Sequence, residues 1–255
     1  MIELKNSVQL DKMRSAGRIL GQLLEQLGAE VRPGITTQAL DEIAERFIRQ
    51  QGGQPAFKGY RGFPATICAS VNEEVVHGIP SDRRLKAGDI VGLDVGAIVE
   101  GYYADAARTF PVGEISREAR DLIATTEAAL NAGIRQARPG NRLGDISHAI
   151  QAVAEEGGYA IVRDFVGHGI GTRLHEPPEV PNYGEPGRGP VLEAGWVLAI
   201  EPMVNLGGAA VEVLPDGWTA VAKDGKISAH FEQTVAVTPQ GPEILTECPK
   251  KKPYK

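Results

Sequence analysis

The sequence of 255 residues contains little cysteine and no long hydrophobic run. Its two cysteines, Cys68 and Cys248, are far apart and outside any C-x-x-C spacing, which excludes a disulfide framework and a zinc–cysteine site. No apolar run approaches the roughly 20 residues of a membrane-spanning helix, and the N-terminus lacks the apolar segment of a signal peptide. Since scarce cysteine also fits a reducing compartment, we expect a cytoplasmic protein.

Positive charge is scarce as well. The chain has 27 Lys and Arg against 33 Asp and Glu, and this balance argues against nucleic-acid binding, which requires a basic face. One basic cluster, at residues 250–255, is expected to be a solvated tail. The proportions of hydrophobic residues (42%) and charged residues (24%) are ordinary for a globular protein, and the length suits one large domain or two small ones.

The segment 88–109 is predicted to form two adjoining strands with a turn near Glu100–Gly101. Asp94 ends the first apolar run and Asp105 lies in the second. A buried charge without a partner costs on the order of several kcal/mol, so each carboxylate needs one. For a single Asp, an ion pair with a nearby arginine such as Arg108 is the simpler alternative. Two Asp in adjoining strands instead favour a cation between them, provided that the chain supplies further ligands.

Apolar residues at spacings of three and four predict four amphipathic helices. The expected N-caps are Ser7, Thr36 or Thr37, Ser116 and Asn141. The helices are expected to end near residues 27, 52, 137 and 157. Strands are expected at Ile67–Val71, Trp196–Ile200, Val211–Leu214, Trp218–Ala222 and His230–Val237, with a Gly/Pro-rich segment over residues 166–190.

The two halves of the chain repeat. Residues 31–34 (VRPG) match residues 137–140 (ARPG), and each stretch precedes a helix. At nearly the same offset, residues 87–94 (AGDIVGLD) match residues 194–201 (AGWVLAIE). We therefore expect one domain of two similar α+β halves, roughly 1–115 and 116–245, related by a pseudo-two-fold axis with their acidic strand ends facing each other.

The repeat extends the set of strand carboxylates from two to four. Glu201 is the counterpart of Asp94, and Glu232 stands before another apolar run. Without a cation, four clustered carboxylates repel one another and some of them protonate. Two divalent ions balance their charge, and such a pair binds a bridging water and lowers its pKa. Oxygen ligands with one imidazole suit Mn, Fe, Co or Zn, among which the sequence does not distinguish.

Three histidines are candidates for the same site. His168 has glycine on both sides, which lets the backbone approach a ligand and adopt positive φ. A single histidine is more often structural, but His175 follows in the same segment and His77 lies in a Val-Val-His-Gly stretch. His148 is expected to be solvated on the polar side of its helix. His230 is expected to share a strand face with the last carboxylate and to line the site.

Several stretches together resemble type I methionine aminopeptidase of the bacterial kind. They are VNEEVVHGIP, GDIVGLDVG followed by DAART, GHGIGTRLHEPP, AIEPM and DGWTAVAKDGKISAHFEQT. They occur in the family's order and spacing over nearly the whole chain, although each alone is a weak match. The resemblance implies an α+β pita-bread fold in its minimal form, in which two pseudo-two-fold related halves carry a curved antiparallel sheet with helices on its outer face.

The resemblance also implies a ligand set for two divalent ions. Matched by position, Asp94 chelates one metal, Asp105 and Glu232 bridge both, and His168 and Glu201 hold the other. Glu201 is additionally expected to act as general base toward the bridging water.

Substrate contacts follow from the same match. His175 is expected to donate a hydrogen bond to the scissile carbonyl or the oxyanion, and His77 to contact the substrate backbone. The expected methionine pocket comprises Tyr60, Phe63, Cys68 and Trp218, with Met203 close by. Three wall positions depart from the family pattern and bear on the tightness of methionine selection: Phe57 in place of a common Cys, Phe63 in place of Tyr and Leu174 in place of Phe.

The leading hypothesis is removal of the initiator methionine from nascent polypeptide N-termini, with a small second residue preferred. Contact with the ribosome fits this task, although no motif shows it, and we expect a monomer. An alternative is an Xaa-Pro dipeptidase or aminopeptidase P of the same fold. Those relatives usually carry a further N-terminal domain, whereas here only 93 residues precede Asp94. A non-enzymatic binding module is disfavoured because every carboxylate and histidine of the site is present.

Overall fold

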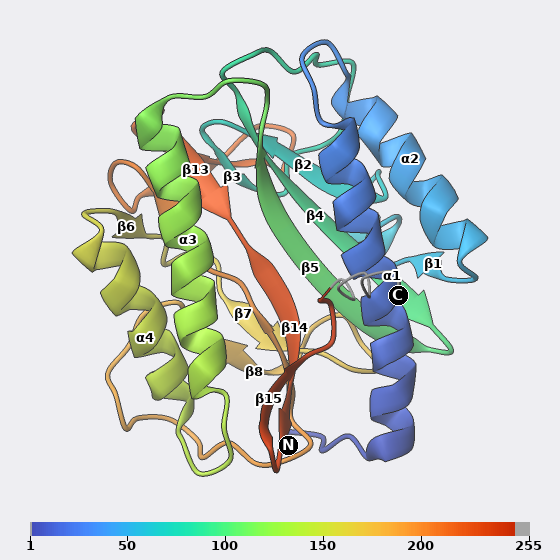
Figure 1. The fold of residues 1–255 in the computed structure, drawn as a ribbon, viewed down its shortest axis with the longest axis vertical. Helices are drawn as coiled ribbons and strands as arrows, with labels where there is room; N and C mark the ends of the chain where they lie inside the picture. Colours follow the sequence, from blue (N-terminus) through green and yellow to red (C-terminus); the bar gives the residue numbers. More distant parts are fainter. Residues whose placement is uncertain (1, 248–255) are drawn as a thin grey trace, which may run out of the picture.

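The computed structural model describes residues 2–247 (Figure 1). Cys248 and the basic cluster at residues 250–255 lie outside the described residues. The helices are α1 (Ser7–Glu30), α2 (Thr37–Gln50), α3 (Arg117–Gln136) and α4 (Leu143–Glu156), with a 3₁₀ turn η1 at Tyr60–Gly62. Among the described residues, none of the helices combines the length and hydrophobicity that crossing a bilayer requires.

The N-cap of α1 is Asn6, so the prediction of Ser7 was wrong by one residue. The Asn6 side chain accepts from the N–H of Gln9 at 3.0 Å, and the Gln9 side chain accepts from the N–H of Asn6 at 2.8 Å. This reciprocal capping box satisfies two backbone donors at once. The pairing favours Asn6 over the neighbouring serine.

The caps of α2 and α3 are confirmed, and that of α4 is not. Thr36 and Ser116 each accept a backbone hydrogen bond in the first turn. Asn141 instead directs its amide to the end of α3. At the start of α4, whose N-cap is Arg142, the carboxylate of Asp145 accepts from the N–H of Arg142 at 2.7 Å, which is the half of a capping box that the third helical residue supplies.

The strands form one large sheet and two small ones. The large sheet has the order β1-β4-β5-β14-β9-β7-β8, with β2 pairing β4 and β15 pairing β14, and its strand pairs are antiparallel. Its strands are β1 (Gln54–Pro55), β2 (Ile67–Val71), β4 (Ile90–Val99), β5 (Tyr102–Pro111), β7 (Gly167–Gly169), β8 (Glu176–Val180), β9 (Val197–Ile200), β14 (Glu232–Thr238) and β15 (Gly241–Ile244). One small sheet contains β3 (Glu74–Val76), β11 (Val211–Val213) and β12 (Ala220–Ala222). The other contains β6 (Ala160–Ile161), β10 (Met203–Asn205) and β13 (Ser228–His230).

Most strand predictions are confirmed, including the turn between β4 and β5, where Glu100 and Gly101 both have positive φ, as a two-residue hairpin turn of type I′ requires. The expected single strand His230–Val237 is wrong, because it breaks at Phe231 into β13 and β14. The Gly/Pro-rich segment also contains β7 and β8, two strands that lack the apolar alternation by which sequence patterns reveal strands.

The order of the large sheet is symmetrical about its centre. β5 and β14 are neighbours, β4 and β9 lie outside them, and β2 and β7 pair with these in turn. In Figure 1, α1 and α2 cover the half of the sheet that holds β4 and β5, and α3 and α4 cover the other half on the same side. This arrangement confirms the expected α+β fold of two related halves.

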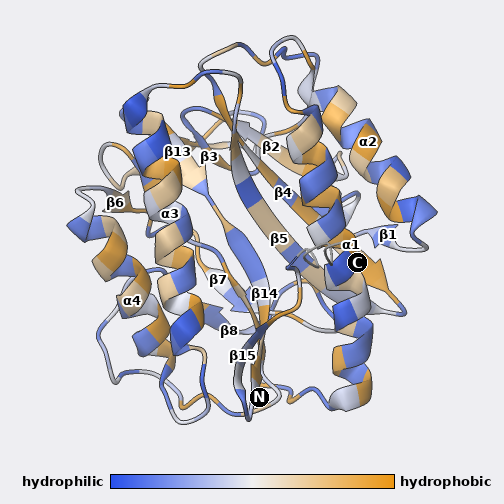
Figure 2. Cartoon of the chain, in the orientation of Figure 1, coloured by the Kyte–Doolittle hydropathy of each residue, from blue (hydrophilic) through white to orange (hydrophobic). Residues whose placement is uncertain are grey.

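The acids point away from the helices because side chains alternate along a strand. On β4, Leu93 and Val95 belong to the hydrophobic cluster under α1 and α2, so Asp94 projects from the opposite face. On β14, Val235 packs into the cluster under α3 and α4, whereas Glu232 lies on the other face. Figure 2 shows hydrophilic stretches that interrupt the hydrophobic strands β5 and β14 in the centre of the sheet. The face away from the helices therefore holds the polar site.

Candidate metal centre

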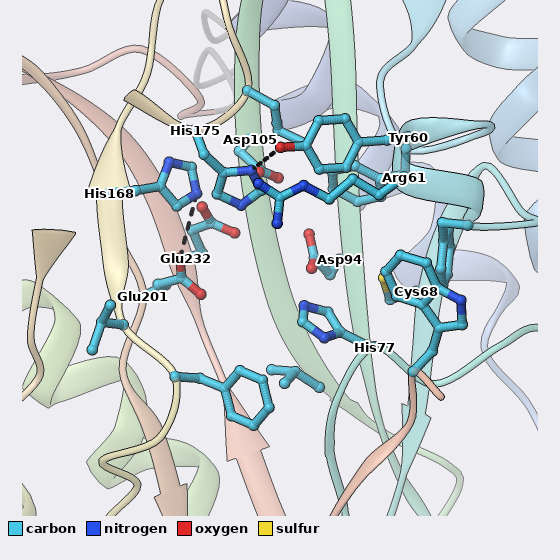
Figure 3. A pocket seen from close by; sticks show the side chains of 17 residues that line it. Tyr60, Arg61, Cys68, His77, Asp94, Asp105, His168, His175, Glu201 and Glu232 are labelled. Carbon is cyan, nitrogen blue, oxygen red and sulfur yellow. Dashed lines mark hydrogen bonds and ion pairs between the residues drawn. The ribbon is translucent and has the colours of Figure 1, made fainter. Parts of the chain in front are cut away.

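One pocket on this face is lined by every residue expected at the metal site and in the substrate pocket except His230 and Met203. Its metal-site candidates are Asp94, Asp105, His168, Glu201 and Glu232. Figure 3 shows the four carboxyl groups directed into a common space with His168 on one wall. Side chains from β4, β5, β7, β14 and the end of β9 thus meet at one point, although they come from both halves of the chain.

Strand register brings the carboxylates together. Ala107 of β5 lies opposite Asp94 of β4 on one side and opposite Glu232 of β14 on the other. Asp105 is two residues from Ala107 and therefore projects from the same face. Its backbone is held by Thr234, whose hydroxyl accepts from the Asp105 N–H at 2.9 Å and donates to the Asp105 carbonyl at 2.7 Å.

Burial raises the pKa of all four carboxyl groups. The pKa of Asp94 rises to about 6 and that of Glu201 to about 8. For Asp105 and Glu232, burial followed by the charges of the neighbouring acids raises the pKa well above its usual range. Arg108 does not compensate them, because it pairs with Glu25 on the helix side at 2.8 Å. Within residues 2–247, the acids therefore have no lysine or arginine partner that would hold all four of them ionised.

His168 is oriented as a ligand. Its Nδ1 lies 2.9 Å from the carbonyl oxygen of Gly169, so this nitrogen carries the hydrogen and Nε2 presents its lone pair to the pocket. Burial lowers the pKa of His168 to about 3, which keeps the ring neutral at physiological pH. Nε2 lies 3.5 Å from Oε1 of Glu201.

The glycines beside His168 do not serve the purpose expected from the sequence. Gly167 and Gly169 do not have positive φ. A Cβ at Gly167 would lie 2.4 Å from the carbonyl oxygen of Ala199, and one at Gly169 would lie 2.2 Å from that of Pro177. The glycines therefore allow neighbouring strands to approach β7, and this approach carries the histidine into the site.

The donor set fits divalent cations. Ligand atoms of Asp105, His168 and Glu232 lie within 4.8 Å of one another, and so do those of Glu201, His230 and Glu232. Among residues 2–247, the buried atoms Asp94 Oδ1, Asp105 Oδ1 and Glu232 Oε1 have no hydrogen-bond partner. Buried polar atoms are normally paired, and oxygen-rich sites with imidazole suit hard or borderline divalent ions.

His230 and Asn182 lie beside Glu201. The Nε2 atom of His230 lies 3.6 Å from Oε2 of Glu201, so His230 reaches the site although it does not share a strand with Glu232. The amide of Asn182 donates to the backbone carbonyl of Glu201 at 3.0 Å. No sequence pattern pointed to Asn182, because it lies in a segment without periodicity.

His77 and His175 lie on opposite sides of the space that the carboxyl groups enter in Figure 3. His77 has a φ of 62°, a region that residues with a side chain rarely adopt and that is often found at functional sites. Burial lowers the pKa of His77 to about 4. Nδ1 of His175 lies 2.8 Å from the hydroxyl of Tyr60. Desolvation of the His175 ring, and then the charge of Arg61, lower its pKa.

Apolar and aromatic side chains form the remaining wall of the pocket. The ring centroids of Phe63 and Trp218 lie 5.1 Å apart in an edge-to-face arrangement. Cys68 is buried, and burial raises the pKa of its thiol well above its usual range, so the thiol is protonated at neutral pH. Met203 does not line this pocket. It is fully buried in a hydrophobic cluster with Val76 and Phe165, which both line the pocket, so it lies behind the pocket wall, near the pocket but not in it.

Some wall residues were missed by the prediction. Arg61 follows Tyr60 with a φ of 49°, and the ring of Phe165 packs edge-on against His77 at 5.4 Å between centroids. Phe165 and Val166 directly precede the Gly-His-Gly stretch. Phe57 and Leu174, which were identified as departures from the family pattern, do lie in the wall.

Known proteins resemble this chain along nearly its full length. A profile of metallopeptidase family M24 matches residues 11–239. A methionine aminopeptidase of Clostridium perfringens is 58% identical over 246 residues, covering 96% of this chain and 99% of the relative. The crystal structure of a methionine aminopeptidase from Thermotoga maritima superposes with a TM-score of 0.96 at 46% identity, covering 97% of this chain and 100% of that one.

Proteins of the alternative class share the fold. An Xaa-Pro dipeptidase from Bacillus anthracis superposes with a TM-score of 0.77 at 24% identity, and the match covers 97% of this chain but 63% of that one. At that identity the likeness shows the fold alone. The match to the family profile and the identity to full-length relatives show that the chain belongs to metallopeptidase family M24 and, within it, to the methionine aminopeptidases.

Proposed function

We propose that the chain removes the N-terminal methionine from nascent polypeptides and prefers a small second residue. The observation that carries this proposal is the convergence of four buried carboxylates and one imidazole beside an apolar pocket. The activity of close relatives, as their names state it, supports the choice of methionine.

Two divalent ions are proposed as cofactors, with Mn, Fe, Co and Zn as candidates. Asp94 would bind one ion, and His168 and Glu201 would bind the other. Asp105 and Glu232 would contribute to both. When bound, such ions supply Lewis acidity and lower the pKa of water.

Glu201 would move the proton. It lies at the end of β9 with its backbone fixed by Asn182, and its carboxyl group lies between His168 and His230. A carboxylate in this position can take a proton from the attacking water and pass it to the leaving amine.

His175 and His77 would bind the scissile amide. Because the pKa of each ring is lowered, both are neutral near pH 7 and can donate one hydrogen bond. When the hydroxyl of Tyr60 donates to Nδ1 of His175, the ring hydrogen is on Nε2, which is then free to donate to the carbonyl or the oxyanion. His77 would contact the substrate backbone from the opposite side.

The methionine side chain would occupy the apolar part of the pocket. Tyr60, Phe63, Cys68 and Trp218 supply aromatic and sulfur contacts, which suit a flexible thioether. Phe57 and Leu174 would complete this wall and set how tightly methionine is selected.

The domain organisation, oligomeric state and cellular location are also proposed. One catalytic domain spans residues 1–255, with duplicated halves at roughly 1–115 and 116–245, and it acts as a monomer in the cytoplasm on chains emerging from the ribosome. The symmetrical order of the sheet supports the duplication.

A peptide assay tests the proposal. Chelator-treated protein is reloaded with Mn, Fe, Co or Zn in turn and given a Met-Ala-Ser peptide and an Ala-Pro-Ser peptide, with Glu201→Gln as the inactive control. Release of methionine with at least one metal is expected. Faster cleavage of the Xaa-Pro bond than of the methionine peptide would establish the dipeptidase alternative. No cleavage of either peptide with any metal would favour the hypothesis of a non-enzymatic binding module.

A further inference from the structure

A buried ion pair joins the N-terminal segment to the loop that carries His175. Nζ of Lys5 lies 2.5 Å from Oε2 of Glu176, and the side chains are 2% and 4% exposed. Lys5 precedes α1, whereas Glu176 directly follows His175 and begins β8. The pair thus connects two segments that are 171 residues apart in the chain.

Both partners are tied to the backbone around them. The N–H of Lys5 donates to the carbonyl of Gly195 at 2.8 Å, and its ammonium group also donates to the carbonyl of Glu3 at 3.1 Å. Oε1 of Glu176 accepts from the N–H of Arg173 at 3.1 Å and from the hydroxyl of Thr172 at 3.3 Å. Glu176 therefore folds the preceding loop around its own carboxylate, and Lys5 fixes that carboxylate to the N-terminal segment.

The loop is built to admit the lysine. A Cβ at Gly171 would lie 2.4 Å from Cε and 2.8 Å from Nζ of Lys5. Any side chain at this position would push the ammonium group away from the carboxylate. The carbonyl of Gly171 accepts from the N–H of Tyr103 at 2.8 Å, so the start of the loop is fixed to β5, the strand that carries Asp105.

Stability alone is a weak reason for such a pair. Burying two charges costs about as much as their attraction returns, and apolar side chains of similar volume often replace buried pairs without loss. A buried ion pair with directional hydrogen bonds does, however, fix the relative positions of the segments that carry it. Here the geometry concerns His175, whose ring lies 4.2 Å from that of His168 between centroids and whose Nδ1 meets Tyr60.

We propose that the Lys5–Glu176 ion pair is a positioning device that holds the loop of residues 171–176 so that His175 stays over the metal centre. This inference rests on the proposed role of His175. Lys5 is thus a positioning residue, which acts on the reaction through Glu176 and His175 without touching the substrate. Removing the pair releases the loop, and misplacement of a catalytic group by about 1 Å can cost about 100-fold in rate.

A mutant cycle with His175 tests the proposal. The variant Lys5→Met/Glu176→Gln removes both charges, and the new glutamine side chain keeps an oxygen that accepts from the N–H of Arg173. We expect kcat for methionine release to fall at least about tenfold, with a smaller change in KM. In the His175→Ala background the same two changes should alter kcat less than about twofold, because the group they position is gone.

A matched control uses a second ion pair of the N-terminal region. Arg14 of α1 binds Glu243 of β15 through two hydrogen bonds of 2.7 and 2.8 Å. Arg14→Met/Glu243→Gln makes a comparable change at an ion pair that does not line the pocket and should leave kcat unchanged. If the Lys5 double variant does not fold, Glu176→Gln alone enters the same cycle.

The outcomes separate this inference from the proposed function. An equal loss of kcat with and without His175, or no loss in the wild-type background, overturns the positioning role. If the wild-type protein releases no methionine with any metal, the proposed function fails, and hydrogen exchange then tests the ion pair by itself. Faster exchange of the amides of Gly171 and Arg173 in the double variant would support the proposal that the ion pair holds the loop. Unchanged exchange would overturn that proposal.

Discussion

The clustered carboxylates predict that the metal-free protein loses stability as the pH rises above neutrality. An acid whose pKa is higher in the folded protein than in the unfolded chain stabilises the fold at low pH, and this contribution is lost as the pH rises through the folded pKa. The pKa of Glu201 is raised from 4.5 to about 8, and those of Asp105 and Glu232 are raised in the same direction.

The magnitude can be worked out for the window between pH 6.5 and 8. Each carboxyl group that stays protonated only in the folded state costs about 1.4 kcal/mol per pH unit. Glu201 alone therefore predicts a loss of about 2 kcal/mol across this window, and Asp105 and Glu232 add to it. The lowered pKa values of His77, His168, His175 and His230 act in the opposite direction. Because histidine in the unfolded chain titrates near pH 6.5, they offset part of the loss in the lower half of the window.

Urea unfolding of chelator-treated protein at pH 6.5, 7.25 and 8 measures this loss. The Glu201→Gln variant is the control, since it lacks the titrating group and should show a shallower slope. With saturating Mn²⁺ the slope should reverse, because the cation binds the deprotonated carboxylates. A metal-free unfolding free energy that stays flat or rises between pH 6.5 and 8 would refute the reasoning.

Two substitutions test parts of the site, and a third tests the close packing of the chain next to His77. Glu201→Gln should lower kcat at least about 100-fold with an unchanged circular dichroism spectrum, and near-normal turnover would remove its role in proton transfer. His168→Ala should weaken metal binding about tenfold or more in calorimetric titration; an unchanged dissociation constant would place the ligand elsewhere. Gly78→Ala should lower the free energy of unfolding in urea by about 1–3 kcal/mol, because its Cβ would lie 2.4 Å from the carbonyl oxygen of Ala69. An unchanged midpoint would contradict that contact.

Sequence patterns located the carboxylates because each one interrupts a run of packing residues. Asp94, Asp105 and Glu232 stand in strands whose alternate residues enter the core, and the repeat pointed to Glu201. Helices α2 and α3 were also predicted to within a residue or two, since their caps and apolar spacings are local features.

The missed features depend on contacts between distant segments. The reason for the glycines beside His168 is the approach of Ala199 and Pro177, which no local pattern shows. The partner of Lys5 is 171 residues away. Such pairings arise from the packing of the whole sheet.

Anomalous diffraction from a crystal loaded with Mn²⁺ tests the central claim most directly. We expect two peaks about 3.5–4 Å apart, each bounded by oxygen or nitrogen atoms of Asp94, Asp105, His168, Glu201 and Glu232. A map with no peak among these side chains, or with its peaks elsewhere in the molecule, would contradict the account.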